Sequence, residues 1–150
     1  MKKIINILDK NKNIGLDTMI FIYLFEENKK YADICELIFD RVSKGKNIAH
    51  ISNLSLFEVL VGSYKKGLAS KDYIQLFLNM PNLKIYPTNV AILNKAAQIR
   101  AKFGVRPMDS ICYSNAIYGK AKVFITNDKE LQKIKNKEIK VLILEDYLAK

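Results

Sequence analysis

The feature that most constrains this fold is a regular alternation of short apolar segments with longer helical ones. Five runs of four or five residues have the β-branched, apolar composition of buried strands: Asn13–Leu16, Asn47–Ile51, Leu83–Tyr86, Lys122–Thr126 and Lys140–Leu144. Because helices are predicted between successive strands, the strands are joined by crossovers and pair in parallel. The pattern therefore predicts an α/β fold with a central, mainly parallel sheet and helices on both of its faces.

Capping residues, glycines and hydrophobic periodicity set the bounds of the predicted helices. The segments are Lys2–Lys10, Thr18–Phe25, Tyr31–Ser43, a helix capped by Ser52 or Asn53 that runs to about Lys66, a helix capped by Ser70, Asn89–Lys102, Asp109–Tyr118 and a short helix from Lys129. No repeat or low-complexity linker interrupts this series. We therefore expect residues 1–150 to form a single domain.

The chain carries a formal net charge of +10, from 25 Lys and Arg against 15 Asp and Glu. A surplus of this size favours association with polyanions such as nucleic acids, although a Lys-rich amino-acid usage would produce it as well. No apolar run is long enough to span a membrane, and the N-terminal segment lacks the apolar core of a signal peptide. Cys35 and Cys112 stand in apolar helical contexts without a disulfide or metal-binding spacing. These features predict a cytoplasmic protein with two free, buried thiols.

Four acidic residues occupy positions that are unusual for surface carboxylates. Asp17 and Asp128 directly follow predicted strands, so both belong at the sheet edge where ligands bind in parallel α/β proteins. Asp109 opens a predicted helix, and Glu58 stands in mid-helix between apolar neighbours. A helix cap would explain Asp109 or Asp128 taken alone, but it cannot explain Glu58.

Carboxylates that converge through the fold repel one another and are costly to bury. A hard divalent cation resolves this conflict, because Mg²⁺ and Mn²⁺ take carboxylate oxygens as ligands. An acidic metal pocket in a basic protein fits phosphodiester hydrolysis, in which the metal neutralises phosphate charge and activates water. The sole histidine, His50, lies in a predicted strand and is expected to be structural, which disfavours His-dependent nucleophilic catalysis. The glycine motifs that cradle phosphates are absent from the sequence.

Four stretches together resemble the PIN domain family, and within it the VapC-type toxins of prokaryotic toxin–antitoxin pairs. They are, in chain order, IGLDTMIFIYLF, ISNLSLFEVLVG, RPMDSICYSNAIYGKAKVFITNDKEL and KVLIL. The resemblance implies a three-layer α/β/α sandwich and a Mg²⁺- or Mn²⁺-dependent endoribonuclease. It also marks residues 1–12 as an added N-terminal helix, since this leading segment is longer than in minimal members of the family.

The resemblance also assigns roles to particular residues. It makes four of them catalytic acids and metal ligands: Asp17, Glu58, Asp109 and Asp128. It gives the orientation of these carboxylates, or of the attacking water, to three polar neighbours: Thr18, Thr126 and Asn127. The polar end of the strand at Thr126 is therefore expected to be one wall of a metal pocket.

The resemblance implies three partners: an RNA substrate, a second copy of the chain, and an antitoxin whose C-terminal segment reaches the acidic pocket. The apolar stretches Phe21–Phe25 and Tyr73–Met80 are candidate contact surfaces, unless both belong to the core. Two other readings stay open: a housekeeping nuclease for RNA processing or DNA flap cleavage, and a non-catalytic nucleic-acid-binding or partner-binding module. A phosphate-accepting receiver domain also places acids at strand ends, but it leaves Glu58 and Asp109 unexplained.

Overall fold

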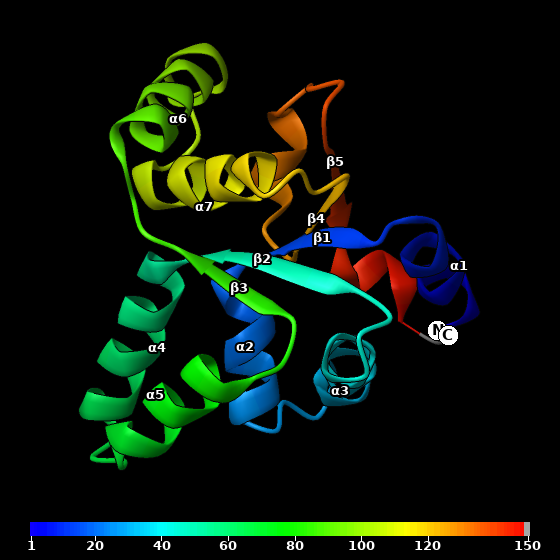
Figure 1. Cartoon of the computed structure of the whole chain (residues 1–150), viewed down its shortest axis with the longest axis vertical. Helices are drawn as coiled ribbons and strands as arrows, with labels where there is room; N and C mark the ends of the chain where they lie inside the picture. The colour runs from blue at the N-terminus through cyan, green and yellow to red at the C-terminus, as the bar shows by residue number, and fades with distance from the viewer. Residues whose placement is uncertain (149–150) are drawn as a thin grey trace.

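The computed structural model describes residues 1–148 and contains one five-stranded parallel sheet (Figure 1). Its strands, in the spatial order β3-β2-β1-β4-β5, are β3 (Leu83–Tyr86), β2 (Ile48–Ser52), β1 (Asn13–Leu16), β4 (Val123–Thr126) and β5 (Lys140–Ile143). All four neighbouring pairs are parallel, with Gly15 beside both His50 and Phe124. The predicted α/β fold with a central parallel sheet is confirmed, and each predicted strand lies within one residue of its observed bounds.

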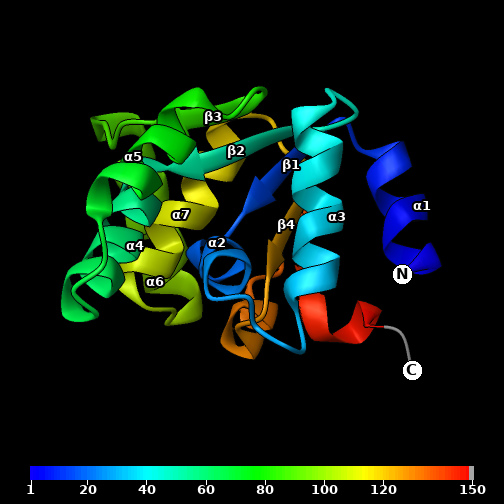
Figure 2. The same cartoon turned by 90° about the horizontal axis from the view of Figure 1, so that it is seen from below.

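Helices cover both faces of this sheet and complete a three-layer α/β/α sandwich (Figures 1 and 2). The helices are α1 (Lys2–Lys10), α2 (Thr18–Phe25), α3 (Ala32–Ser43), α4 (Asn53–Lys65), α5 (Ser70–Asn79), α6 (Val90–Phe103) and α7 (Pro107–Tyr118), with the short 3₁₀ turns η1 (Lys129–Lys133) and η2 (Leu144–Tyr147). Helices α6 and α7 lie on one face, and α2 to α5 lie on the other. Within residues 1–148, no helix is both long and apolar enough to cross a membrane.

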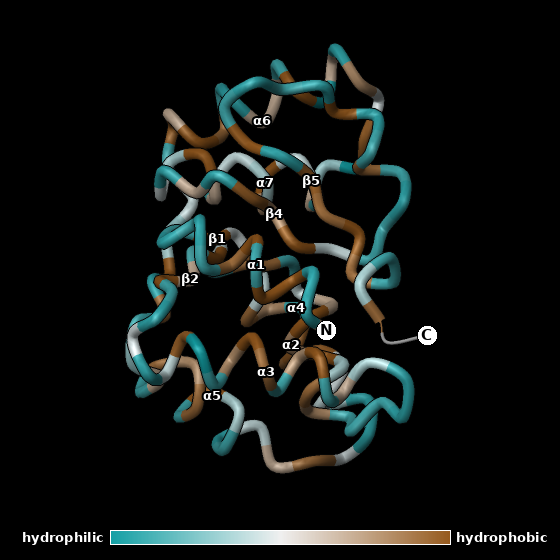
Figure 3. Tube along the Cα trace, turned by 90° about the vertical axis from the view of Figure 1, so that its right-hand side faces the viewer, coloured by the Kyte–Doolittle hydropathy of each residue, from teal (hydrophilic) through white to brown (hydrophobic). Residues whose placement is uncertain are grey.

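The side chains of β4 divide the interior into two apolar cores. Val123 and Ile125 belong to the larger core, which α2 to α5 cover and which α1 extends. Phe124 points the other way, into the core beneath α6 and α7. This alternation follows from the two-residue period of a strand, and both sets are apolar because the sheet is buried on both faces. Figure 3 shows the same apolar colouring along β4 and β5, with hydrophilic loops around them.

Two predicted helix starts are displaced in the structure. Asp109 was expected to open α7, but the helix begins at Pro107 with Arg106 as its N-cap residue. Proline favours the first helical position because its φ angle is already helical and its missing N–H has no partner there. Ser70 was expected to cap α5, yet Ala69 holds the cap position, and the Ser70 hydroxyl donates to the Tyr64 hydroxyl at 3.2 Å.

Helix α7 packs unusually close to the sheet through two glycines. A Cβ atom added at Gly15 on β1 would lie 2.4 Å from the Cβ of Ala116. One added at Gly119, at the end of α7, would lie 2.3 Å from the Nδ1 of His50. The close approach fixes α7 against β1 and β2, so the first turn of α7 is held over the edge where the strands end.

His50 is a structural residue, as the sequence predicts. Its Nε2 lies 2.9 Å from the Oδ1 of Asn13, and its Nδ1 lies 3.0 Å from the hydroxyl of Tyr86. Burial, with a smaller contribution from the charge of Lys84, lowers the pKa of His50 to about 4. The ring is therefore neutral at pH 7, and it joins β1, β2 and β3.

Helix α1 is tied to the body of the protein by polar contacts as well as by apolar packing. Ile4 and Leu8 are fully buried in the larger core. Arg41 donates to Asp9 at 2.6 Å, and the Asn47 side chain donates to the carbonyl of Leu8 at 2.9 Å. The predicted helix over Lys2–Lys10 is confirmed, and these contacts fix it to α3 and to the segment before β2.

Candidate active site

Asp17 lies at the carboxyl end of β1 and caps the first turn of α2. One of its carboxylate oxygens accepts from the backbone N–H of Thr18 at 2.7 Å. The other accepts from the hydroxyl of Thr126 at 2.5 Å. Asp17 is only 6% exposed, so the end of a central strand holds a nearly buried carboxylate.

Thr126 connects Asp17 to Asp128 across the neighbouring strand ends of β1 and β4. Its hydroxyl donates to Asp17 and accepts from the backbone N–H of Asp128 at 3.0 Å. The Asp128 carboxylate in turn accepts from the backbone N–H of Glu130 at 2.9 Å, which caps η1. The polar end of this buried strand therefore holds two carboxylates in fixed positions.

Glu58 reaches the same edge of the sheet from α4. The Thr18 hydroxyl donates to its Oε2 at 2.5 Å and also lies 3.0 Å from the hydroxyl of the buried Ser55. Glu58 is three residues after Ser55, so both side chains lie on one face of α4. Thr18 thereby joins α2 to α4 and orients the Glu58 carboxylate.

Asp109 enters from the first turn of α7 and is paired with an arginine. The Nε of Arg106 donates to its Oδ2 at 2.7 Å, and the Nη2 donates to its Oδ1 at 3.2 Å. The same Nη2 donates to the Oδ2 of Asp128 at 2.8 Å. One guanidinium therefore bridges two acids that come from α7 and from the end of β4.

The charges of Asp17, Glu58 and Asp109 influence one another. Burial raises the pKa of Asp17 to about 6 against the lowering effect of the Thr126 hydrogen bond, and the charges of Asp109 and Glu58 raise it further. Burial also raises the pKa of the Cys112 thiol, and the charges of these same acids add to that rise. Cys112 is therefore an inert, protonated thiol beneath the acids, and the site carries excess negative charge.

The donor set fits a hard divalent cation, although the acids are held apart as they stand. Within residues 1–148, no three Asp, Glu, His or Cys side chains converge closely enough to hold a metal ion between them. The donors are all oxygen atoms, which Mg²⁺ and Mn²⁺ prefer, and a bound cation would relieve the repulsion that Asp109 and Glu58 exert on Asp17.

In the absence of metal, Asp17→Asn is expected to raise the melting temperature above pH 6 and to leave it almost unchanged near pH 4. The folded pKa of Asp17 lies above its unfolded value, so ionisation of its carboxylate destabilises the fold increasingly between about pH 4 and pH 6, and the effect is complete above pH 6. The pKa rise from 3.8 to about 6 corresponds to a gain of about 3 kcal/mol at pH 8. Thermal melts of both proteins in EDTA from pH 4 to pH 8 measure it, and a gap that shrinks with pH contradicts this account.

The predicted polar neighbours of the acids fall into two groups. Thr18 and Thr126 contact the carboxylates directly, as described above. Asn127 turns away from them: its amide donates to the Tyr23 hydroxyl at 3.1 Å, and its Oδ1 accepts from the backbone N–H of Glu145 at 3.1 Å. Asn127 therefore ties the loop after β4 to α2 and η2.

Two residues of the site were missed in the sequence, Arg106 and Ser55. Each stands three residues before one of the acids, at the i,i+3 spacing that puts two side chains on the same face of a helix. That spacing is the signal that could have identified both. Arg106 in particular was masked by the expectation that the helix begins at Asp109.

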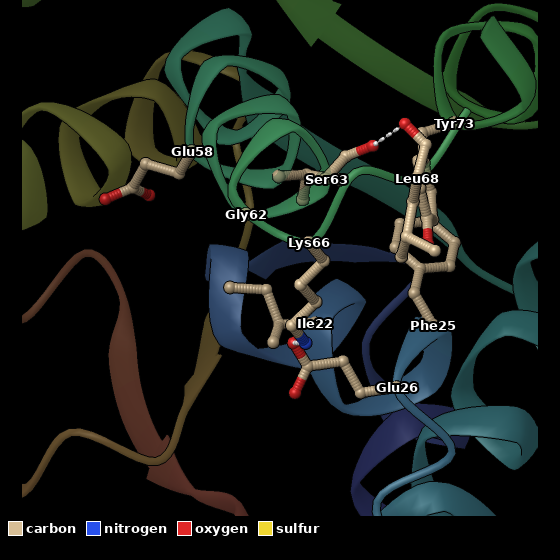
Figure 4. A pocket seen from close by; sticks show the side chains of 10 residues that line it. Ile22, Phe25, Glu26, Glu58, Gly62, Ser63, Lys66, Leu68 and Tyr73 are labelled. Carbon is tan, nitrogen blue, oxygen red and sulfur yellow. Dashed lines mark hydrogen bonds and ion pairs between the residues drawn. The ribbon is translucent and has the colours of Figure 1, made fainter. Parts of the chain in front are cut away.

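An apolar groove leads away from the acidic site between α2, α4 and α5 (Figure 4). Glu58 stands at one end of it, and Leu68 and Tyr73 stand at the other. Its apolar wall consists of Ile22, Phe25, Val59, Leu68 and Tyr73. An ion pair between Lys66 and Glu26 crosses its rim.

The two stretches predicted as contact surfaces are divided between the core and this groove. The Phe21 ring is fully buried and stacks on Phe77 with ring centroids 4.6 Å apart. Phe25 and Tyr73 pack on each other at 5.0 Å and also line the groove. Only part of each stretch is therefore available to a partner.

The fold and this site together define a class of protein. It is a parallel α/β sandwich with four carboxylates at the carboxyl edge of its sheet, where ligands bind in such folds. The PIN domain family profile matches residues 14–137, which include all four acids. The chain belongs to the PIN domain family, and α1 precedes the matched region. No curated protein matches the sequence significantly.

Solved structures with the same fold come from toxin–antitoxin complexes. VapBC2 from Rickettsia felis, bound to a DNA fragment from its promoter, is 21% identical with a TM-score of 0.66, over 87% of this chain and 97% of that one. DNA-bound VapBC from Salmonella typhimurium is 21% identical with a TM-score of 0.61, over 88% and 98%. A toxin–antitoxin complex from Klebsiella pneumoniae is 18% identical with a TM-score of 0.64, over 88% and 97%. At this identity the likeness shows the fold.

Proposed function

We propose that this protein is a Mg²⁺- or Mn²⁺-dependent endoribonuclease. The observation that carries the proposal is the set of four carboxylates at the carboxyl edge of the sheet, where the charges of Asp109 and Glu58 help to raise the pKa of the buried Asp17. The net charge of +10 on the whole chain supports a polyanionic substrate that is held around this acidic centre. The PIN family match and the charge together favour a nuclease over a receiver domain or a module that only binds.

Each acid has a role that follows from its contacts. Asp17, Asp109 and Asp128 would hold the cation, and Glu58 would complete the set or accept a proton from the attacking water. When bound, the cation neutralises the scissile phosphate and lowers the pKa of water. Thr126 keeps Asp17 and Asp128 in register, and Thr18 keeps Glu58 turned toward the site.

Cleavage of total cellular RNA by the purified protein tests this function directly. Discrete fragments with Mg²⁺ or Mn²⁺ that disappear in EDTA support a selective metal-dependent ribonuclease. Structured DNA with a single-stranded flap, run in parallel, separates this activity from that of a flap nuclease. No cleavage of either substrate by folded, partner-free protein would contradict the proposal.

We further propose that the protein is the toxin of a type II toxin–antitoxin pair, and that the groove between α2, α4 and α5 receives a segment of the antitoxin. The solved structures with this fold are described as parts of such complexes. The groove ends at Glu58, so an apolar segment lying in it would reach the acidic site and block it. A second copy of the chain is the other proposed partner, and Phe57 and Val90 are apolar residues left exposed for it.

Gly62→Leu is expected to weaken binding of the antitoxin at least about tenfold, because it fills the groove from its α4 wall. A Cβ at Gly62 meets no atom within 4 Å, so the side chain enters open space without strain. Lys65→Leu, on the exposed face of the same helix, is the matched control and should bind normally. Calorimetry with the product of an adjacent small gene measures both, and equal affinities would place the partner elsewhere.

A further inference from the structure

Arg106 is the one cationic side chain, among residues 1–148, that is paired with two of the site's acids. It bonds Asp109 through Nε and Nη2 and bonds Asp128 through Nη2. The two carboxylates are 12% and 17% exposed, whereas the arginine side chain is 71% exposed. A largely solvent-exposed guanidinium thus covers two largely buried carboxylates.

The backbone of Arg106 is fixed while its side chain is free to move. Arg106 is the N-cap residue of α7, its carbonyl accepts from the N–H of Ser110 at 3.0 Å, and Pro107 follows it. The side chain can therefore leave the acids by rotation about its own bonds, with no change in the helix. Its exposure means that nothing packed over it opposes this movement.

The carboxylate oxygens that Arg106 occupies are those a divalent cation would need. A guanidinium supplies one positive charge and directed hydrogen bonds, so it relieves the repulsion between Asp109 and Asp128 in the absence of metal. A cation that binds these oxygens must first displace it, and displacement costs the hydrogen bonds that Arg106 makes. The pairing therefore opposes cation binding and also stabilises the metal-free site.

We propose that Arg106 is an internal competitor of the divalent cation: it holds Asp109 and Asp128 in the metal-free protein and leaves them when the cation binds. This inference rests on the proposed metal-dependent function and concerns the regulation of metal binding at that same site. Arg106 is a positioning residue in this role, because it acts through the two acids. It sets the cation concentration at which the site fills.

Titration of the full chain with Mn²⁺ by calorimetry, without RNA, tests the proposal. Arg106→Gln is expected to bind Mn²⁺ about tenfold more tightly than the wild type. Arg106→Lys keeps the charge but loses the planar set of N–H donors, and its Mn²⁺ affinity is expected to fall between those of the other two proteins. In the metal-free state Arg106→Gln should melt at a lower temperature, and its rise in melting temperature on adding Mn²⁺ should be larger.

Lys129→Gln is the matched control for the loss of one positive charge beside Asp128. Its ammonium pairs with Glu145 at 3.1 Å, so this variant should change the Mn²⁺ affinity by less than about threefold. An affinity of Arg106→Gln equal to or weaker than that of the wild type overturns the proposal, and so does the absence of Mn²⁺ binding to both proteins at millimolar concentration. If Arg106→Gln fails to fold, Arg106→Lys tests the proposal instead. A Mn²⁺ affinity higher than that of the wild type supports it, and an equal or weaker affinity overturns it.

The titration separates this proposal from the ribonuclease assignment. If Arg106→Gln binds Mn²⁺ more tightly than the wild type but the wild type cleaves no RNA, the competition is supported and the proposed ribonuclease function is contradicted. If the wild type cleaves RNA but Arg106→Gln binds Mn²⁺ with unchanged affinity, the ribonuclease function is supported and the competition is contradicted.

Discussion

Asp17→Asn is expected to abolish metal-dependent RNA cleavage, with a loss of more than about a hundredfold, while the protein stays folded. Removal of a group that only orients a metal ligand costs about 10- to 100-fold, and Asp17 is assigned as a ligand itself. The substitution keeps the shape of the side chain, and Asn is as good a helix cap as Asp. The amide oxygen can still accept from the Thr18 N–H, and the amide NH₂ can donate to the Thr126 hydroxyl in place of the bond that the carboxylate accepted.

Asp33→Asn is the matched control, because it makes the same chemical change on the exposed face of α3. It should cleave RNA at the wild-type rate. Asp128→Asn should lose activity as Asp17→Asn does, since Thr126 places the two carboxylates side by side. Rates are measured as initial velocities on a fragment identified from total RNA, with circular dichroism to verify folding. Full activity in either site variant would contradict the proposal that these acids are metal ligands.

Gly119→Ala is expected to destabilise the protein by about 3 kcal/mol, the upper range for forcing an extra methyl into a packed interior. The added Cβ would lie 2.3 Å from the Nδ1 of His50 and 2.8 Å from its Cβ. The ring cannot move aside easily, because Asn13 and Tyr86 bond its two nitrogens. Helix α7 would have to lift away from β2. For a chain of this length the melting temperature should fall by roughly 6–12 °C.

Gly62→Ala is the control for this prediction, since it is the same substitution in a helix with no atom within 4 Å of the new Cβ. It should raise stability by about 0.5–1 kcal/mol, because alanine loses less backbone entropy than glycine in a helix. Melting curves of the three proteins in EDTA measure both effects. If Gly119→Ala melts with the wild type, α7 is not held against β2 as described.

The order and type of the elements could be predicted from sequence because each is signalled locally. The strand β1 is set by its apolar run, and α6 by Asn89 before it and Gly104 after it. The predicted starts of α5 and α7 are wrong, because residue type alone indicates a cap at Ser70 and a helix start at Asp109. Ser70 and Asp109 both have competing partners, Tyr64 and Arg106, and those contacts exist only in the folded chain.

The site could be predicted in part for the same reason. The placement of Asp17 and Asp128 beyond strand ends follows from the parallel sheet, so their proximity is a property of topology. The pairing of Arg106 with two acids, the turn of Asn127 toward Tyr23, and the groove beside Glu58 depend on side-chain packing between segments far apart in sequence. Periodicity carries no information about such contacts.

The four acids are spread over most of the chain, from position 17 to position 128, and this spread has a consequence for the protein during its own synthesis. A ribosome-bound chain that has not yet released β4 contains Asp17, Glu58 and Asp109 but lacks the strand that sets Asp17 in place through Thr126. Because β4 lies between β1 and β5, the centre of the sheet closes only when this late segment inserts beside the earliest strand. The proposed nuclease site is therefore incomplete in the nascent chain until β4 has emerged, and the proposed activity toward RNA would begin only after this segment has folded.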